Sequence, residues 1–390
     1  MTKAFSFFPG CSFHSTGISY TESTQYVTGC LDIALYEIKD WNCCGASAAP
    51  TVNDDLMYSL STRNLALSED QHPYLQIMTP CSGCYAALKR AEVKTKNDAS
   101  YRTHINNIIE MNYRGTVEVT NLLDAFTTPE MINDIVNHLK LQLGGMKVAC
   151  YYGCAQVRPQ EITQAPNAEN PMNMEQLLNA AGAECIDWSY KTECCGASNH
   201  VVRPKAARNA AERIFHNAQI NGAECIVTAC PLCWLNLDMR EEKINQEHKT
   251  NYHMPIYFFI ELIAMALGAN PEQAGITRHF VPAVDLVTQK LGPIVPKEEP
   301  ETPEEAKARR IREALERKAV RDKEKAATAK IAKTTESKTT ESKTTESKTT
   351  ESKSTESKST ESTATVEANK PTELTELKDS GSNKGGGIHE

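Results

Sequence analysis

The 390-residue sequence contains no uninterrupted apolar stretch of the roughly 18 residues that a membrane-spanning helix requires. The best candidate, residues 254–269, is interrupted by Glu261 and has Pro255 near its start, so we expect a buried amphipathic helix there. Nothing near the N-terminus resembles a secretory leader, because Lys3 alone precedes a short apolar stretch, Ala4 to Phe8. These absences predict a cytoplasmic protein, with peripheral attachment to the cytoplasmic face of a membrane as the alternative.

The part of the chain after Pro296 lacks cysteine and all three large aromatic residues, so it cannot bury enough apolar surface to fold as a domain. Residues 297–333 are rich in Ala, Glu, Lys and Arg and predict a charged helix that begins near Pro303. Acidic residues are interleaved with its basic ones, which favours a solvated helix over a lipid-binding one. Residues 334–390 begin with Thr-Thr-Glu-Ser-Lys repeats and predict a disordered low-complexity tail.

The formal net charge of -8 lies in residues 1–296, which hold 22 basic and 30 acidic residues, whereas the remainder holds 20 of each. An acidic part of this kind argues against a nucleic-acid partner. The same part holds all 14 cysteines. Clustered cysteines in a cytosolic chain more often bind metal or do redox chemistry than form disulfides.

A long-period repeat divides residues 1–296 into two homologous halves. Strand patterns precede the cysteines in each half, at 4–8 and 74–78 in the first and at 147–152 and 224–228 in the second. Helix patterns follow, as at 85–93 and 234–243, and strands alternating with helices predict parallel α/β units. The phrase Gly-Ala-Glu-Cys-Ile, at 182–186 and 222–226, predicts a helix end followed by entry into a strand. We therefore predict α/β domains over 1–143 and 144–296, each with cysteines at the carboxyl edge of a parallel sheet.

Each half carries five cysteines in the same order: one alone, then Cys-Cys-Gly-Ala-Ser, then Cys-x-x-Cys. The two intervals are 31 and 36 residues in the first half and 39 and 34 in the second. Four thiolates suffice for zinc or for an ordinary cubane cluster, but here five are present and two are neighbours. Neighbouring cysteines can contact different irons of a larger cluster, which favours iron–sulfur binding over zinc or a dithiol–disulfide relay. The candidate ligands are Cys11, Cys43, Cys44, Cys81, Cys84, Cys154, Cys194, Cys195, Cys230 and Cys233.

These motifs resemble the cysteine-rich CCG proteins, whose best example is the B subunit of heterodisulfide reductase. The resemblance covers about residues 1–292 and includes Phe-Phe-Pro-Gly-Cys11 and Asp-Trp-Asn-Cys43-Cys44-Gly45. It implies that the ten cysteines above hold two noncubane [4Fe-4S] clusters. The sequence departs from its own repeat at one point, because Pro80 precedes Cys81 whereas Pro231 follows Cys230.

Three functions follow from this resemblance and from the residues themselves. The first is an iron–sulfur oxidoreductase subunit that passes electrons from a partner subunit to a disulfide substrate. The second is a quinone-linked electron-transfer or anchor subunit of a succinate dehydrogenase or fumarate reductase, since the family includes such subunits. The third is a zinc-stabilised scaffold without redox function. The chain has no Gly-x-Gly-x-x-Gly after a strand, so we expect no flavin of its own and expect electrons from partner subunits that carry flavin or iron–sulfur clusters.

Several other residues favour structural roles. Four cysteines lie outside the repeat among apolar residues and predict buried thiols: Cys30, Cys150, Cys185 and Cys225. His14, three residues after Cys11, could donate a proton near the first site, but a surface histidine is the favoured interpretation. Tyr151 and Tyr152 precede Cys154 and predict either the wall of a pocket or ordinary strand packing.

Overall fold

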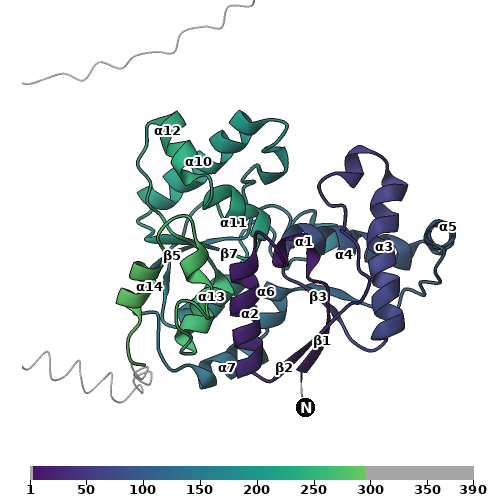
Figure 1. Cartoon of the computed structure of the whole chain (residues 1–390), viewed down its shortest axis with the longest axis horizontal. Helices are drawn as coiled ribbons and strands as arrows, with labels where there is room; N and C mark the ends of the chain where they lie inside the picture. Colours follow the sequence, from purple (N-terminus) through teal and green to yellow (C-terminus); the bar gives the residue numbers. More distant parts are fainter. Residues whose placement is uncertain (1–2, 295–390) are drawn as a thin grey trace, which may run out of the picture. The chain divides into compact units, whose positions relative to one another are not determined.

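Two parallel four-stranded sheets, one from each half of the chain, form the framework of the protein (Figure 1). The computed structural model describes residues 3–294. The first sheet consists of β1 (Lys3–Phe7), β2 (Ile33–Glu37), β3 (Ile77–Thr79) and β4 (Val119–Asn121). The second consists of β5 (Lys147–Tyr151), β6 (Glu184–Cys185), β7 (Cys225–Thr228) and β8 (Ile256–Phe258). The prediction of two homologous parallel α/β units is confirmed.

The strand order is the same in both sheets, β2-β1-β3-β4 and β6-β5-β7-β8. In each half, the second strand therefore lies on one side of the first strand, and the third strand lies on its other side. Parallel sheets of this kind leave a crevice at the carboxyl ends of the two strands where the direction reverses. Those strands are β1 and β3 in the first half and β5 and β7 in the second.

Helices connect the strands in each half. Those of the first are α1 (Gly10–Phe13), α2 (Ile18–Cys30), α3 (Asp54–Gln71), α4 (Ser82–Asn97), α5 (Ala99–Ile109), α6 (Leu122–Phe126) and α7 (Pro129–His138). Those of the second are α8 (Gln160–Thr163), α9 (Asn173–Ala180), α10 (Pro204–Ile220), α11 (Pro231–Leu237), α12 (Glu241–His248), α13 (Phe259–Ala266) and α14 (Val284–Lys290). Short 3₁₀ turns, η1 (Ala49–Thr51), η2 (Ala197–Asn199) and η3 (Ile276–Arg278), complete the connections.

The repeated Gly-Ala-Glu-Cys-Ile phrase acts as predicted. Gly182 follows α9 with φ of 94° and Gly222 follows α10 with φ of 79°, the left-handed conformation that glycine adopts without strain. The chain then enters β6 and β7 directly.

The buried helix expected over residues 254–269 is present but shorter than predicted, because α13 spans only Phe259–Ala266. Residues 256–258 pair with β7 as strand β8, and only then does α13 begin. Every residue of α13 is buried, Glu261 included. The Glu261 carboxylate has partners in the interior, because it accepts from the backbone N–H of Phe258 at 2.8 Å and lies 3.0 Å from His279 Nε2. Glu261 therefore caps a buried helix instead of marking a solvent-facing side.

The helix predicted over 234–243 is likewise divided, into α11 and α12. Asp238 lies at the break, and its carboxylate accepts from the backbone N–H groups of Phe280, at 2.8 Å, and Val281. These bonds tie the turn between the two helices to a distant loop, which the helix pattern alone does not reveal.

Helix α2 of the first half packs on the second half. The ring of Tyr20 stacks on Phe258 with centroids 4.0 Å apart, and its hydroxyl donates to the carbonyl of Ala229 at 3.3 Å. Two more hydrogen bonds join the halves near the cysteines, from Ser82 Oγ to Gln156 Oε1 at 2.7 Å and from Tyr85 OH to the carbonyl of Thr163 at 3.0 Å. The boundary at 143/144 stays a prediction, but the two halves share buried contacts.

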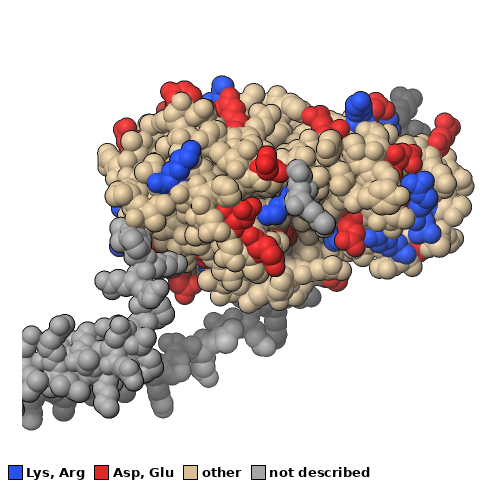
Figure 2. All heavy atoms as spheres, turned by 90° about the horizontal axis from the view of Figure 1, so that it is seen from below, with Lys and Arg blue, Asp and Glu red and all other residues tan. Residues whose placement is uncertain are grey.

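The charged helix expected over 297–333 and the tail expected over 334–390 lie outside the described residues. Between residues 3 and 294, no helix combines the length and the apolarity needed to cross a bilayer. Acidic and basic side chains are interspersed on the face that Figure 2 shows, with large uncharged areas between them.

The stacked pair of Tyr20 and Phe258 predicts a strong effect on stability. Tyr20→Ala should lower the free energy of unfolding by about 3–5 kcal/mol, because it removes a fully buried ring between the halves. Tyr20→Phe should cost about 1 kcal/mol, for the hydrogen bond alone. Urea unfolding monitored by circular dichroism measures both. Tyr36→Ala, at a half-exposed site, is the control, and equal losses in Tyr20→Ala and Tyr36→Ala would contradict the argument.

Candidate iron–sulfur site

The five predicted cysteines of the first half meet at the carboxyl edge of the first sheet. Cys11 lies in α1, directly after β1, and the Cys43–Cys44 pair follows β2. Cys81 is the residue before α4 and Cys84 lies in its first turn, directly after β3. Loops after three parallel strands therefore supply the set, as the sequence predicts.

The second half repeats this arrangement. Cys154 follows β5, and the Cys194–Cys195 pair lies in the long connection between β6 and α10. Cys230 precedes α11, which carries Cys233, directly after β7. Pro231 occupies the first position of that helix, where its missing N–H is not needed. The two sets are thus equivalent in position despite the shifted proline.

Within each set the sulfur atoms approach one another closely. Cys44 Sγ lies 3.2 Å from Cys84 Sγ, and the matching pair in the second half, Cys195 and Cys233, is 3.5 Å apart. The backbone N–H of the glycine after each vicinal pair points to the sulfur of the pair's first member, at 3.5 Å for Gly45 and 3.3 Å for Gly196. Backbone donors of this kind stabilise negative charge on sulfur.

The thiols in each set also perturb one another's ionisation. Hydrogen bonds from Cys43 and Cys84 lower the pKa of the Cys44 thiol to about 4, while the pKa of Cys43 is raised because its proton is shared with Cys44. In the second set, the hydrogen bond from Cys154 lowers the pKa of Cys194 to about 6. A few sulfurs can therefore ionise only while their neighbours stay protonated.

This behaviour fits a site built for a positively charged metal core. Like charges packed this closely cannot all ionise unaided, whereas iron ions bind thiolates and displace their protons. No group of three or more Cys, His, Asp or Glu side chains within residues 3–294 is arranged as the ligands of a single metal ion.

The two sets adjoin one another. The pKa of the Cys81 thiol is raised chiefly by a hydrogen bond to Cys230 of the other half. The pKa of Cys230 is lowered chiefly by a hydrogen bond from Cys233 and next by the one from Cys81. Both thiols are buried, so the contact between the sets is shielded from solvent.

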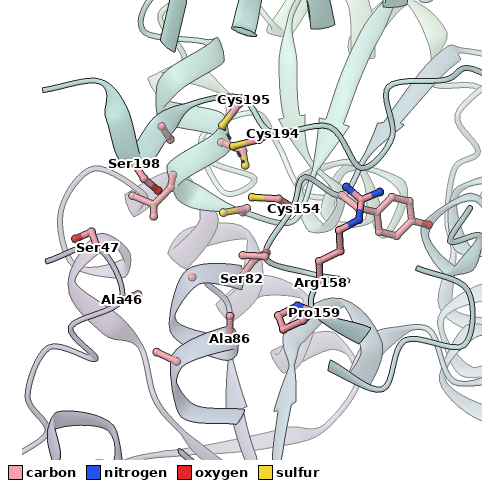
Figure 3. A pocket seen from close by; sticks show the side chains of 18 of the residues that line it. Ala46, Ser47, Ser82, Ala86, Cys154, Arg158, Pro159, Cys194, Cys195 and Ser198 are labelled. Carbon is pink, nitrogen blue, oxygen red and sulfur yellow. Dashed lines mark hydrogen bonds between the residues drawn. The ribbon is translucent and has the colours of Figure 1, made fainter. Parts of the chain in front are cut away.

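A cavity of about 600 Å³ lies beside the second set only, between the two halves of the chain. Figure 3 shows Cys154, Cys194 and Cys195 on one side of it, and Ser82 and Ala86 of α4 on the other. Small and apolar side chains form much of its wall, among them Pro50, Met57, Ala86, Ala87, Ala168 and Leu232. None of the five cysteines of the first set lines it.

Comparisons with known proteins agree with this geometry. The family model of the CCG cysteine-rich domain matches twice, over residues 5–89 and 148–238. The membrane anchor subunit of 8-methylmenaquinol:fumarate reductase from Wolinella succinogenes is 33% identical over 73% of this chain and 100% of its own length. The chain belongs to the CCG cysteine-rich family.

Other relatives of this CCG protein are subunits of a different reductase. The B subunit of a CoB-CoM heterodisulfide reductase from Methanosarcina acetivorans is 28% identical over 73% of this chain and 96% of its own length. The corresponding protein from Methanosarcina mazei is also 28% identical, with the same coverage of both chains. Both groups of relatives belong to multi-subunit oxidoreductases, and so the chain is related to oxidoreductase subunits.

One solved structure shares the fold. A hypothetical protein from Helicobacter pylori matches with a TM-score of 0.58 and 13% sequence identity, over 73% of this chain and 53% of that one. At this identity the likeness concerns the fold alone.

The two sites of the CCG protein differ in exposure. In the first set Cys11 and Cys43 are exposed, and beside them the ring of His14 stacks on Trp41 with centroids 6.2 Å apart. His14 Nε2 also lies 3.4 Å from Glu37, so this histidine is part of the surface. In the second set Cys194 is exposed and Cys154 is half-buried, and both line the cavity.

The four cysteines outside the repeat belong to neither set, and two of them are neighbours, with Cys150 Sγ 3.7 Å from Cys185 Sγ. Cys150 and Cys225 are buried, as predicted, whereas Cys30 and Cys185 are only half-buried. Tyr152 lines the cavity, whereas Tyr151 is buried and donates a hydrogen bond to the carbonyl of Glu193 at 2.7 Å. Tyr152 therefore forms part of the wall of a pocket, and Tyr151 takes part in ordinary strand packing.

Apart from Tyr152 and the cysteines of the second set, sequence reasoning missed the residues that build the cavity. The repeated Ala-Ser after each Cys-Cys-Gly was a usable signal, because Ala46, Ser47, Ala197 and Ser198 all line it. Arg90 follows Ser82 and Ala86 at the four-residue spacing of one helix face, a second usable signal. No sequence signal pointed to Arg158, whose guanidinium lies 2.7 Å from Glu169.

The glycines that precede the sulfurs yield a direct test. A Cβ on Gly10 would lie 2.9 Å from Cys84 Sγ, and one on Gly153 would lie 3.0 Å from Cys233 Sγ. Gly10→Ala or Gly153→Ala should therefore displace a ligand and lose about half of the bound iron, since only one set is affected. Iron analysis of anaerobically purified protein measures the loss.

Gly145→Ala is the matched control, because Gly145 has nearly the same φ, 67°, but open space around its missing side chain. This variant should lose about 1–2 kcal/mol of stability, because alanine is less stable than glycine in the left-handed conformation, and it should keep its iron. Full iron content in all three variants would show that these glycines do not make room for the sulfurs.

Proposed function

We propose that this CCG protein is the electron-transfer subunit of a larger oxidoreductase and exchanges electrons with a quinone in the cavity beside its second cysteine set. The ten cysteines would hold two noncubane [4Fe-4S] clusters, which supply one-electron transfer. The observation that carries the proposal is the 600 Å³ cavity, which is walled largely by small and apolar side chains and touches the second set alone. Such a cavity suits a flat, uncharged ring better than a polar substrate.

Electrons would enter at the first set. Cys11 and Cys43 are exposed there, next to the aromatic pair of His14 and Trp41, so a partner can approach the sulfurs closely. Aromatic residues are enriched in protein–protein interfaces. The buried contact between Cys81 and Cys230 then links the entry set with the set beside the cavity. The partner is an iron–sulfur or flavoprotein subunit, because this chain lacks a flavin motif.

The residues around the cavity would position the quinone. Reduction of a quinone consumes two electrons and two protons, and its two carbonyl oxygens accept hydrogen bonds. Arg90 and Arg158 are the donors in the wall, because the hydroxyls of Ser82 and Tyr152 already donate to Gln156 and Glu175, and the apolar side chains between them exclude water. Arg158 is held in place by Glu169 and by Thr192, whose hydroxyl accepts from the guanidinium at 3.1 Å.

The relatives support this choice. The Wolinella succinogenes protein, which matches over its full length, is named as a subunit of a menaquinol-linked fumarate reductase. The proposed location is therefore peripheral, on the cytoplasmic face of a membrane, where a quinone is available.

Disulfide reduction is the second candidate, favoured by a specific observation. Cys194 is exposed and Cys154 is half-buried, so a sulfur substrate in the cavity could approach the second set directly. The Methanosarcina relatives are named as subunits of reductases that act on a heterodisulfide. A zinc-stabilised scaffold is the third candidate, which metal analysis distinguishes from both.

Metal content tests the cofactor. Anaerobically purified protein should contain about eight irons per chain, negligible zinc and a brown colour, because two sets of thiolates would each hold four irons. Two tightly bound zinc ions and a colourless protein would overturn the proposal.

Cavity volume tests the substrate site. Ala86→Leu should raise the KM for a short-chain quinone about tenfold, because the larger side chain occupies cavity space, and should leave the iron content unchanged. Ala99→Leu, at an exposed position of α5, is the matched control. Each variant is assayed with a quinone and with a mixed disulfide. Turnover of the disulfide without turnover of the quinone would favour the second candidate.

A further inference from the structure

The loops that follow the two Cys-Cys-Gly motifs carry exposed aliphatic side chains. Val52 of the first loop is 67% exposed, and Val201 and Val202 of the second are 75% and 80% exposed. The same two loops line the cavity through Ser47 and Ser198, which are themselves exposed, so the cavity opens to the surface between them. Grouped exposed apolar residues mark interaction surfaces.

Basic residues adjoin the exposed valines of the second loop. Arg203 and Lys205 follow directly, and both are exposed. Arg208, one turn further along α10, is paired with Glu247. Three cations and one carboxylate therefore gather beside an apolar tip, in a chain whose net charge is -8. Each Lys or Arg near an anionic membrane surface is attracted to it, and apolar side chains beside such cations can enter the headgroup region.

We infer that residues 46–57 and 197–205, here called the docking loops, seat the mouth of the cavity on an anionic phospholipid surface. The inference rests on the proposed function, because a membrane is where a long-chain quinone resides. With the valines in the headgroup region, the cavity mouth faces the bilayer. A quinone can then pass from lipid to the second cysteine set without crossing water.

The composition of the docking loops favours lipid over a protein partner. Protein interfaces are enriched in Tyr, Trp and Phe and depleted in lysine, whereas both loops expose valine, the second holds a lysine, and neither contains any of those three aromatic residues. The aromatic pair of His14 and Trp41 lies instead beside the first set. The first loop carries Asp54 and Asp55 close to Val52 and no Lys or Arg, so the second loop, which holds the cations, makes the closer approach to anionic lipid.

Vesicle flotation of the complete, cluster-loaded chain tests the inference. The wild-type protein should float with vesicles of phosphatidylcholine mixed with phosphatidylglycerol, and less so at high salt. The double variant Val201→Asp/Val202→Asp should bind on the order of tenfold more weakly, since two apolar contacts are replaced by repelled charges. Arg203→Gln/Lys205→Gln should weaken binding to the mixed vesicles but not to phosphatidylcholine alone.

Tyr74→Asp/Val136→Asp is the matched control. It adds the same charge at two exposed apolar positions outside the docking loops and should bind like the wild type. All variants keep residues 297–390, so any lipid binding by that segment contributes equally to each. A wild-type chain that does not float, or a Val201→Asp/Val202→Asp chain that floats like the wild type, would overturn the inference.

Quinone kinetics separate this inference from the proposed function. The Val201→Asp/Val202→Asp variant should show a KM about tenfold higher for a long-chain quinone in vesicles and an unchanged KM for a short-chain soluble quinone. An equal KM for the long-chain quinone in variant and wild type would count against the docking loops. Failure of the wild type to turn over the soluble quinone would instead refute the quinone-linked function itself, whatever the flotation result.

Discussion

The close approach of sulfur atoms at the ends of parallel strands constrains the rest of this structure. Sulfur pairs at 3.2 and 3.5 Å leave no room for a side chain on the backbone that passes them, which is why Gly10 and Gly153 stand where a Cβ would collide. Thiols at this spacing also cannot all ionise without a cation among them. The strands, their order and the glycines thus combine to bring the sulfurs of each set together.

The repeat is exact in topology but not in surroundings, and this difference carries the functional proposal. Both sheets have the same strand order and deliver cysteines from equivalent loops. The first set faces the surface beside an aromatic pair, whereas the second faces a cavity that the first half helps to wall through α4. Packing of one half on the other therefore places two equivalent cysteine sets in different surroundings, which is the basis for proposing one as the entry site and the other as the reaction site.

Contacts between the two halves stabilise the fold and also lie beside the cysteine sets. Tyr20 stacks on Phe258 in the core, while Ser82, one residue after Cys81, donates to Gln156 of the other half. Buried polar contacts of this kind fix one relative arrangement of the packed units because any other leaves donors unpaired. The distance between the two cysteine sets and the width of the cavity are set by these contacts.

The sequence by itself determined the repeat, the parallel α/β units and the two groups of five cysteines. It could do so because these depend on local patterns: strand runs that end at cysteines, glycines that end helices, and motifs that recur in register. It did not reveal that residues 254–269 divide into a strand and a buried helix, because β8 exists only through its pairing with β7 and Glu261 is buried only through its capping bond and His279. Nor did it reveal the cavity, since Ala86, Arg158 and Ser198 come from segments far apart in the chain and meet only when the halves pack. Tertiary structure decided which of two matching cysteine sets faces a cavity, because a cavity depends on what packs against a motif and not on the motif itself.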